Sequence, residues 1–162
     1  MATRPIDRKR PRIGDIIEVC VPQKGFAYAH YINHHREPPG FGALLRILPG
    51  IYEARPTKVE DLAAEKELYF VFFPLGAACN RGFVKIVGHV PITAEQQKWP
   101  LFRACNENYH TGVKTWFLWD GRNSWKIGDL KPEHYDLSLE QTINLTELEN
   151  RLESGWMPRD EV

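Results

Sequence analysis

The stretch that decides the fold is Gly14–His34, which reads Gly-Asp-Ile-Ile-Glu-Val-Cys-Val-Pro-Gln-Lys-Gly-Phe-Ala-Tyr-Ala-His-Tyr-Ile-Asn-His. Ile16–Val21 is rich in β-branched residues and ends at Pro22, and the connection Gln23–Gly25 ends in a glycine that suits a turn. Phe26–His34 then alternates aromatic and small side chains, as expected of a strand in a curved sheet with one buried face. The stretch therefore predicts an antiparallel β-hairpin.

Apolar runs on the C-terminal side of this hairpin predict four further strands, at residues 41–48, 68–75, 84–90 and 114–119. The run 68–75 has no alternation, so we expect it to be a central strand with both faces buried. Strands come first and helices late in this order. We therefore expect an α+β fold built on a strongly bent, mainly antiparallel and barrel-like sheet, with a few short helices that include a C-terminal one.

Two segments have helical periodicity, and a short helical turn is also expected over residues 76–81. Lys58–Lys66 carries apolar residues at helical spacing among acidic ones, which predicts a short amphipathic helix with an acidic outer face. Near the C-terminus, Asn144 has the character of an N-cap, with Glu147 three residues on. We expect this second helix to end near Ser154, with Gly155 as its left-handed C-terminal residue.

Charge is balanced over the chain but divided unevenly along it. The 162 residues include 21 basic and 21 acidic ones, which disfavours a strongly basic nucleic-acid binder and a strongly acidic nucleic-acid mimic. Residues 1–12 carry five basic residues against one acid, whereas residues 129–162 carry three basic residues against nine acids. We expect a basic flexible arm over residues 1–12, a single α+β domain over 13–157 and a tail over 158–162.

Composition excludes several classes of protein. Apolar residues make up 43% of the chain and charged residues 26%, which is ordinary for a globular domain and excludes disorder as the main state. No run approaches 18 uncharged apolar residues, so we expect no membrane helix and no membrane partner. The three cysteines (Cys20, Cys79 and Cys105) lie far apart, which fits a cytoplasmic protein with free thiols.

The sequence contains none of the common catalytic templates. It has no GxSxG, GxxxxGK[ST] or GxGxxG motif. His30 and His34 share one face of a strand, but at about 13 Å apart they are too distant to share a metal ion. Cys79 and Cys105 lack the local signature of a nucleophile, which leaves a cysteine hydrolase as the weakest hypothesis. We therefore expect no enzymatic activity, no cofactor and no metal.

Five tryptophans in the last two fifths of the chain favour a binding role. Trp116 and Trp119 are three residues apart on one strand, so we expect at most one of them in the core. The other, with Trp125 after the Asp120–Asn123 turn, is either an exposed anchor or part of an aromatic cap under the C-terminal helix. The residues that we expect to contact a partner are Glu60, Asp61, Glu65, Trp119, Arg122 and Trp125.

Four segments occur in an order that points to a known family. Gly14–Ile16 opens a strand, Gly25–Ala29 opens its return strand, and Arg81–Pro91 and Trp116–Gly121 follow. Over roughly residues 12–125 this order resembles the immunity protein 26 family of bacterial polymorphic toxin systems. Members begin with a GD-led strand and a Gly/aromatic return strand, and carry a W-K-I-x-G-like strand followed by a Y-x-Y-D-G-like one.

The chain departs from the family pattern in three places. Phe83-Val84 replaces the small/Trp entry into the fourth motif, and the Pro38-Pro39 loop and the residues beyond Gly128 are particular to this chain. The resemblance implies a non-catalytic protein that binds and neutralises a cognate toxin domain, such as a nuclease, in the cytoplasm of the producing cell. A basic nuclease would suit the acidic face of residues 58–67 or the acidic C-terminal helix.

The residues also support an alternative without the resemblance. A barrel-like sheet with surface aromatics, together with the basic arm Arg4–Arg12, is suited to holding a single-stranded nucleic acid by base stacking and phosphate contacts.

Overall fold

The computed structural model describes residue 6 and residues 8–162, and its first sheet has five strands. In spatial order these are β4 (Tyr69–Phe73), β3 (Gly42–Ile47), β2 (Gly25–His35), β1 (Asp15–Val21) and β5 (Val84–His89). All neighbours in this sheet are antiparallel. The predicted hairpin is confirmed, because β1 and β2 pair from Ile16 with His30 to Val21 with Gly25.

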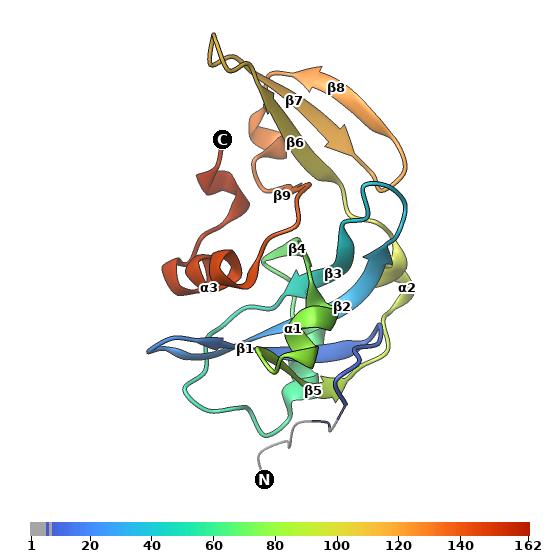
Figure 1. Cartoon of the computed structure of the whole chain (residues 1–162), viewed down its shortest axis with the longest axis vertical. Coiled ribbons are helices and arrows are strands. Elements are labelled where there is room, and N and C mark those ends of the chain that lie inside the picture. The colour runs from blue at the N-terminus through green and yellow to red at the C-terminus, as the bar shows by residue number, and fades with distance from the viewer. Residues whose placement is uncertain (1–5, 7) are drawn as a thin grey trace.

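A second sheet of four strands lies beyond the first and extends to the far end of the molecule (Figure 1). Its spatial order is β8 (Ser124–Gly128), β7 (Lys114–Trp119), β6 (Phe102–Glu107) and β9 (Ser138–Leu139). The last of these runs parallel to its neighbour, and the other pairs are antiparallel. The predicted α+β class is confirmed, but the described strands form two open sheets and close no barrel.

The helices are short and surround the sheets. They are η1 (Val59–Ala64), α1 (Leu75–Asn80), α2 (Ala94–Gln97), η2 (Pro132–His134), α3 (Leu145–Ser154) and η3 (Pro158–Asp160), where η denotes a 3₁₀ helix. Within the described residues, no helix is both long enough and apolar enough to cross a membrane.

The two predicted amphipathic helices form, with one difference of type. The side chain of Asn144 accepts a hydrogen bond from the Glu147 amide at 2.8 Å, and Gly155 follows α3 with φ 71°, as expected of its caps. The segment expected to be a helix over Lys58–Lys66 is the six-residue 3₁₀ helix η1, a type that occurs in pieces of this length. Val59 and two neighbouring apolar residues of η1 are buried, so the predicted amphipathic pattern holds.

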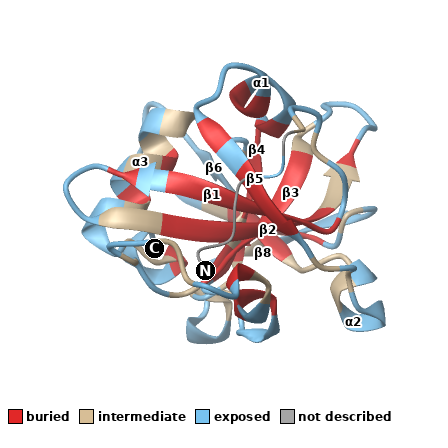
Figure 2. Ribbon diagram, turned by 90° about the horizontal axis from the view of Figure 1, so that it is seen from below, coloured by how far each residue is buried: buried red, intermediate tan, exposed pale blue. Residues whose placement is uncertain are grey.

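The expectation of one buried face for the first sheet is wrong, because both faces are covered (Figure 2). On one face, Ala29 and Tyr31 of β2 belong to a cluster to which α1 and α3 contribute. On the other face, Tyr28 packs with residues of η1, and Ile32 packs with residues of the second sheet. Successive side chains of β2 therefore enter two different buried layers in turn.

Strand β4 lies at an end of the first sheet rather than in its centre. Its outer edge is covered by the chain around residues 138–143: the Phe70 amide donates to Ser138 Oγ at 2.8 Å, and the Ile143 amide donates to the Phe72 carbonyl at 3.0 Å. Phe72 and Phe73 lie in core clusters on opposite sides of the sheet. Because both of its faces are buried, this edge strand has the continuous apolar sequence expected of a central one.

An aromatic and aliphatic cluster joins the two sheets. Ile32, Leu44 and Phe72 of the first sheet meet Phe102 and Trp119 of the second. The ring centroids of Phe72 and Phe102 are 5.2 Å apart, and those of Phe102 and Trp119 are 5.4 Å apart. We call this cluster the junction core, since it fixes one sheet against the other.

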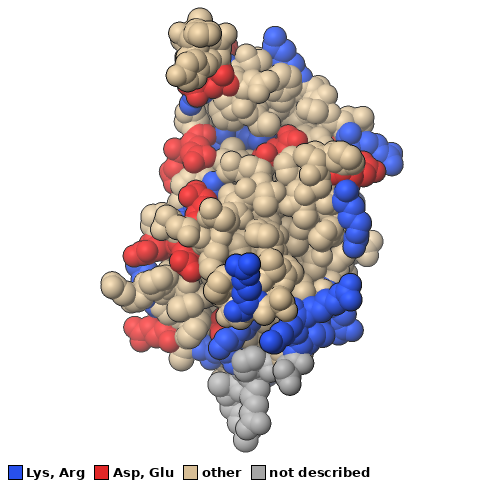
Figure 3. All heavy atoms as spheres, in the orientation of Figure 1, with Lys and Arg blue, Asp and Glu red and all other residues tan. Residues whose placement is uncertain are grey.

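The ends of the described chain are attached to the sheets. Arg8, from the predicted basic arm, makes two hydrogen bonds of 2.7 and 2.8 Å to the buried carboxylate of Asp15, whereas Lys9, Arg10 and Arg12 are exposed. Arg4, which we also assigned to the arm, lies outside the described residues. The predicted tail is packed at its start, because Pro158 is buried. Figure 3 shows basic side chains gathered at the lower end of the molecule and acidic ones along the side that carries α3.

Candidate functional site around Trp99

Two grooves adjoin at the half-buried ring of Trp99, in the segment between α2 and β6. The first groove has a volume of about 670 Å³ and lies between the chain that follows η1 and the chain around α2. The second has a volume of about 400 Å³ and lies between the end of β2 and the β7–β8 turn. Because Trp99 lines both grooves, we treat them as one surface and call it the Trp99 surface.

The junction core supports the ring of Trp99 from below. Its centroid lies 5.8 Å from that of Trp119, 6.1 Å from that of Phe72 and 5.9 Å from that of His35, whose ring is perpendicular to it. Gly121 approaches from the β7–β8 turn with φ 95°, and a Cβ atom there would stand 2.6 Å from Cγ of Trp99. Any larger residue at that position would displace the indole, so the turn and the ring are matched to one another.

Arg46 of β3 forms the inner wall of the first groove. Only 3% of it is exposed. It donates to the Ala63 carbonyl at 2.7 Å and to the Glu65 carbonyl and the Glu67 carboxylate at 3.2 Å each. These bonds hold the strip of chain that follows η1 against β3. The outer walls carry charges of both signs, from Glu65, Lys66, Glu67, Glu95 and Lys98.

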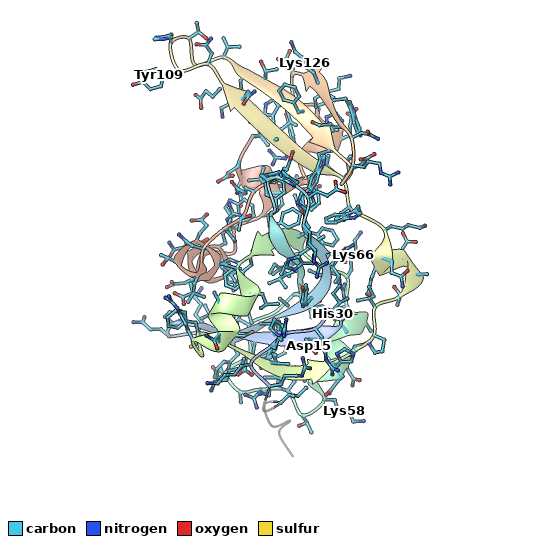
Figure 4. All side chains as sticks on the ribbon, turned by 45° about the vertical axis from the view of Figure 1, so that its right-hand side comes forward. Asp15, His30, Lys58, Lys66, Tyr109 and Lys126 are labelled. Carbon is cyan, nitrogen blue, oxygen red and sulfur yellow. The ribbon has the colours of Figure 1, made fainter. Side chains whose placement is uncertain are left out.

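His30 lies beneath this wall, in the middle of the first sheet (Figure 4). Its Nε2 donates to the Val90 carbonyl at 2.8 Å, which leaves Nδ1 to accept a hydrogen bond from Arg46 at 3.3 Å. This arrangement requires the neutral ring. Burial lowers the pKa of His30 below its ordinary value, and the charge of Arg46 lowers it further.

We expect the free energy of unfolding to fall as the pH drops below about 6.5. His30 has a lower pKa in the folded protein than in the unfolded chain, so the unfolded chain takes up the proton first and is favoured by acid. His34, whose pKa is also lowered by burial, adds to the effect. Denaturant unfolding at about pH 8 and about pH 5 measures the loss, and His30→Gln is expected to have a smaller one. Equal losses in the two proteins would show that His30 does not carry the effect.

The second groove is cationic. Arg36, which follows β2, and Arg122, in the β7–β8 turn, line it with exposed side chains, and within the described residues neither guanidinium has a hydrogen bond or an ion pair. The turn itself is well fixed, since the Asp120 carboxylate accepts from the amides of Arg122 at 3.0 Å and of Asn123 at 2.7 Å. The Arg122 side chain is therefore presented from a rigid turn.

The structure brings together three of the six residues that the sequence nominated. Glu65 lines the first groove, Arg122 lines the second, and Trp119 lies beneath Trp99. Asp61 is exposed and Glu60 half-buried on η1, and a Cβ on Gly88 of β5 would lie 3.1 Å from the Glu60 carboxylate. Neither of these two acids lines a groove at Trp99.

The expected positions of the tryptophans need correction. Trp119 is 6% exposed and belongs to the junction core, so its ring is not an exposed anchor. Trp116 is buried too, on the opposite face of β7, where the guanidinium of Arg103 lies 5.0 Å from its ring centroid. Both enter the core because the first sheet covers one face of the second sheet and the C-terminal segment covers the other. Trp125, which is 42% exposed, is the one of the three that a partner can contact.

Sequence reasoning missed Trp99 and Arg36. Trp99 lies in a polar connection between two elements, and Arg36 in a proline-rich loop, so neither falls in a periodic pattern. The signal available was a large aromatic residue in an otherwise polar segment, Gln96–Pro100. This signal alone does not identify a binding site. Only the packing of the two sheets brings the loop after β2, which carries Arg36, next to Trp99.

Titratable side chains away from Trp99 include a buried thiol and a group of acids in a third groove. Cys79 is buried, and burial raises the pKa of its thiol to about 11, so it is neutral near pH 7. Within residues 6 and 8–162, no three His, Cys, Asp or Glu side chains are close enough to hold a metal ion. A third groove, of about 510 Å³, lies between β6 and the C-terminal segment and carries four acids against the basic residues Arg103 and Lys114: Glu107, Glu140, Asp160 and Glu161.

Comparisons of the chain with protein-family models, with curated proteins and with solved structures found no match. The resemblance to the immunity protein 26 family therefore stays a prediction from the sequence.

Proposed function

We propose that this protein is a non-catalytic, immunity-like inhibitor that binds a cognate toxin domain through the Trp99 surface. The observation that supports the proposal is the position of Trp99 between two grooves, with Glu65 on one side and Arg122 on the other. Tryptophan and arginine are enriched among the residues that dominate binding energy at the centres of protein interfaces.

The rigidity of the surface also favours binding. Trp99 rests on the junction core, Arg46 fixes one groove, and Asp120 fixes the turn that carries Arg122. A preformed surface loses little conformational freedom when a partner docks, which improves affinity without further contacts. An inhibitor that must bind its target tightly and one to one benefits from such a surface.

The charges around Trp99 suit a partner with a complementary pattern. The first groove carries acids and bases in equal number, which suits a partner surface of mixed charge. The four acids of the separate groove at the C-terminal segment would attract the basic surface of a nuclease domain. Complementary charges mainly raise the association rate and disfavour wrong partners. They contribute less to the affinity itself.

The proposal predicts protection against one particular toxin domain. We expect a domain encoded in a reading frame adjacent to this gene to arrest growth when expressed alone, and co-expression of this chain to restore growth. Trp99→Ala should weaken binding of the purified domain by at least about 2 kcal/mol, because it removes the central anchor. Calorimetry measures the affinity, and thermal unfolding shows whether the variant is folded.

Two further variants control this experiment. Tyr109→Ala changes a 95% exposed aromatic at the far tip of the β6–β7 hairpin (Figure 4) and should bind normally. Glu65→Lys changes an exposed residue of the first groove and tests the same surface if Trp99→Ala fails to fold. If no adjacent product arrests growth, or if the wild-type chain gives no relief, the proposed function is wrong.

A further inference from the structure

We infer that the groove between Arg36 and Arg122, which we call the arginine groove, binds carboxylate side chains in an acidic peptide segment of a protein partner. The identity of that partner as a toxin domain rests on the proposed function, whereas the chemistry of the groove does not.

Arg36 and Arg122 reach the arginine groove from different parts of the fold. One follows β2 of the first sheet, and the other lies in the β7–β8 turn of the second. Neither forms an ion pair with a described carboxylate, although other exposed arginines of this chain are paired, such as Arg159 with Asp136 at 2.7 Å. A guanidinium presents its donors in a planar fork that matches a carboxylate. Two unpaired forks across one groove therefore form a receptor for carboxylates.

Aromatic and amide groups complete the arginine groove. Trp99 and His35 contribute rings and Asn33 contributes an amide. An indole beside a cationic site provides an apolar surface on which an aromatic or aliphatic residue next to the acids can pack. The volume of about 400 Å³ falls within the range of pockets that hold small ligands, so it admits a short segment and not a folded domain. The expected ligand is a short acidic segment that contains an apolar residue.

The charge pattern favours a peptide over a nucleic acid. Glu37 lines the same groove next to Arg36 and places a negative charge among the positive ones. A nucleic-acid strand carries a phosphate at every step, and its binding sites are continuous positive tracks with stacking platforms. Two arginines interrupted by a glutamate make no such track. Separate carboxylates on a peptide can instead face each arginine and avoid Glu37.

The inference is tested by direct titration of the full chain. Three fluorescein-labelled probes are compared by anisotropy at about 50 mM salt: the acidic peptide Glu-Glu-Phe-Glu-Glu, the basic peptide Lys-Lys-Phe-Lys-Lys and a single-stranded DNA oligonucleotide. We expect saturable binding of the acidic peptide that weakens as salt is added, and no saturable binding of the basic one. The double variant Arg36→Gln/Arg122→Gln should bind at least about tenfold more weakly, because it loses two charge-assisted contacts.

The control variant is Lys58→Gln/Lys126→Gln, which removes two exposed positive charges that do not line the arginine groove. Figure 4 shows Lys58 toward the lower end of the molecule and Lys126 toward the upper end. The control variant lowers the net charge as much as the arginine variant does, and should bind the acidic peptide as the wild type does. If both double variants bind the acidic peptide equally weakly, net charge alone explains the loss of affinity, and the inference is overturned. Tighter binding of the oligonucleotide than of the peptide would overturn the choice of a peptide ligand.

The same variants separate this inference from the proposed function. If the toxin domain binds the wild type and the arginine variant equally, the proposed function stands and the arginine groove is not used. If the acidic peptide binds as described but no adjacent product is neutralised, the arginine groove is real and the proposed function is wrong.

Discussion

Arg103→Ala is expected to lower the free energy of unfolding by roughly 3–5 kcal/mol, the largest loss that we expect from any side-chain truncation in this protein. The side chain is fully buried and donates to four main-chain carbonyls, those of Tyr135, Leu137, Pro158 and Glu161. Truncation removes this donor from all four carbonyls, of which Pro158 keeps the Glu161 amide as a donor, and opens a cavity beside Trp116. Urea unfolding followed by circular dichroism measures the loss.

Two variants show whether the loss comes from this network. Arg103→Lys keeps the charge but cannot supply the same fork of donors, so its stability should fall between those of the wild type and the alanine variant. Arg159→Ala breaks an exposed ion pair with Asp136 in the same segment and should change stability little. If Arg103→Ala and Arg159→Ala unfold at the same urea concentration as the wild type, Arg103 does not hold the C-terminal segment in place.

Gly25→Ala is the second substitution for which we expect a large effect, a loss of roughly 3 kcal/mol or more. Gly25 has φ 123°, and a Cβ atom there would lie 2.1 Å from the carbonyl oxygen of Tyr52. The strain and the clash fall beside the two hydrogen bonds that join Phe26 to Tyr52. We expect the melting temperature to drop and the long loop that contains Tyr52 to be cut faster by protease.

Gly112→Ala is the matched control, because it separates the clash from the strain. Gly112 also has a positive φ, 69°, but it lies in an exposed turn where a Cβ would meet nothing within 4 Å. Gly112→Ala should lower the free energy of unfolding by about 1 kcal/mol, because its only cost is an alanine in a conformation that favours glycine. A loss for Gly25→Ala no greater than that for Gly112→Ala would mean that the Tyr52 loop moves aside without cost.

The parts of the fold that follow from local pattern were predicted. The β1–β2 hairpin follows from a β-branched run and a glycine turn, and α3 from Asn144 and Gly155 as its caps. These features depend on residues close together in the chain, so the sequence contains their causes. The acidic outer side of η1 was predicted on the same basis.

Features that depend on distant partners were not predicted. β4 has the sequence of a central strand because both of its faces are packed in core clusters, although it lies at the edge of the sheet beside residues 138–143. No periodicity within residues 69–73 distinguishes a central strand from such an edge strand. Trp119 is a residue type that is common among interface anchors, but it packs in the junction core. The candidate site was half predicted for the same reason: Glu65 and Arg122 were identified by residue type, whereas Trp99 becomes a site only once the two sheets meet.

The covered edge of β4 has a consequence for how the protein is made. On the ribosome, residues 69–73 emerge long before residues 138–143, so the first sheet exists for a time with an open, apolar edge. An edge of this kind pairs readily with other chains. Contacts between such distant segments also slow folding. The nascent chain is therefore prone to aggregate until residues 138–143 have emerged, and a chaperone that covers this edge would improve the yield of folded protein.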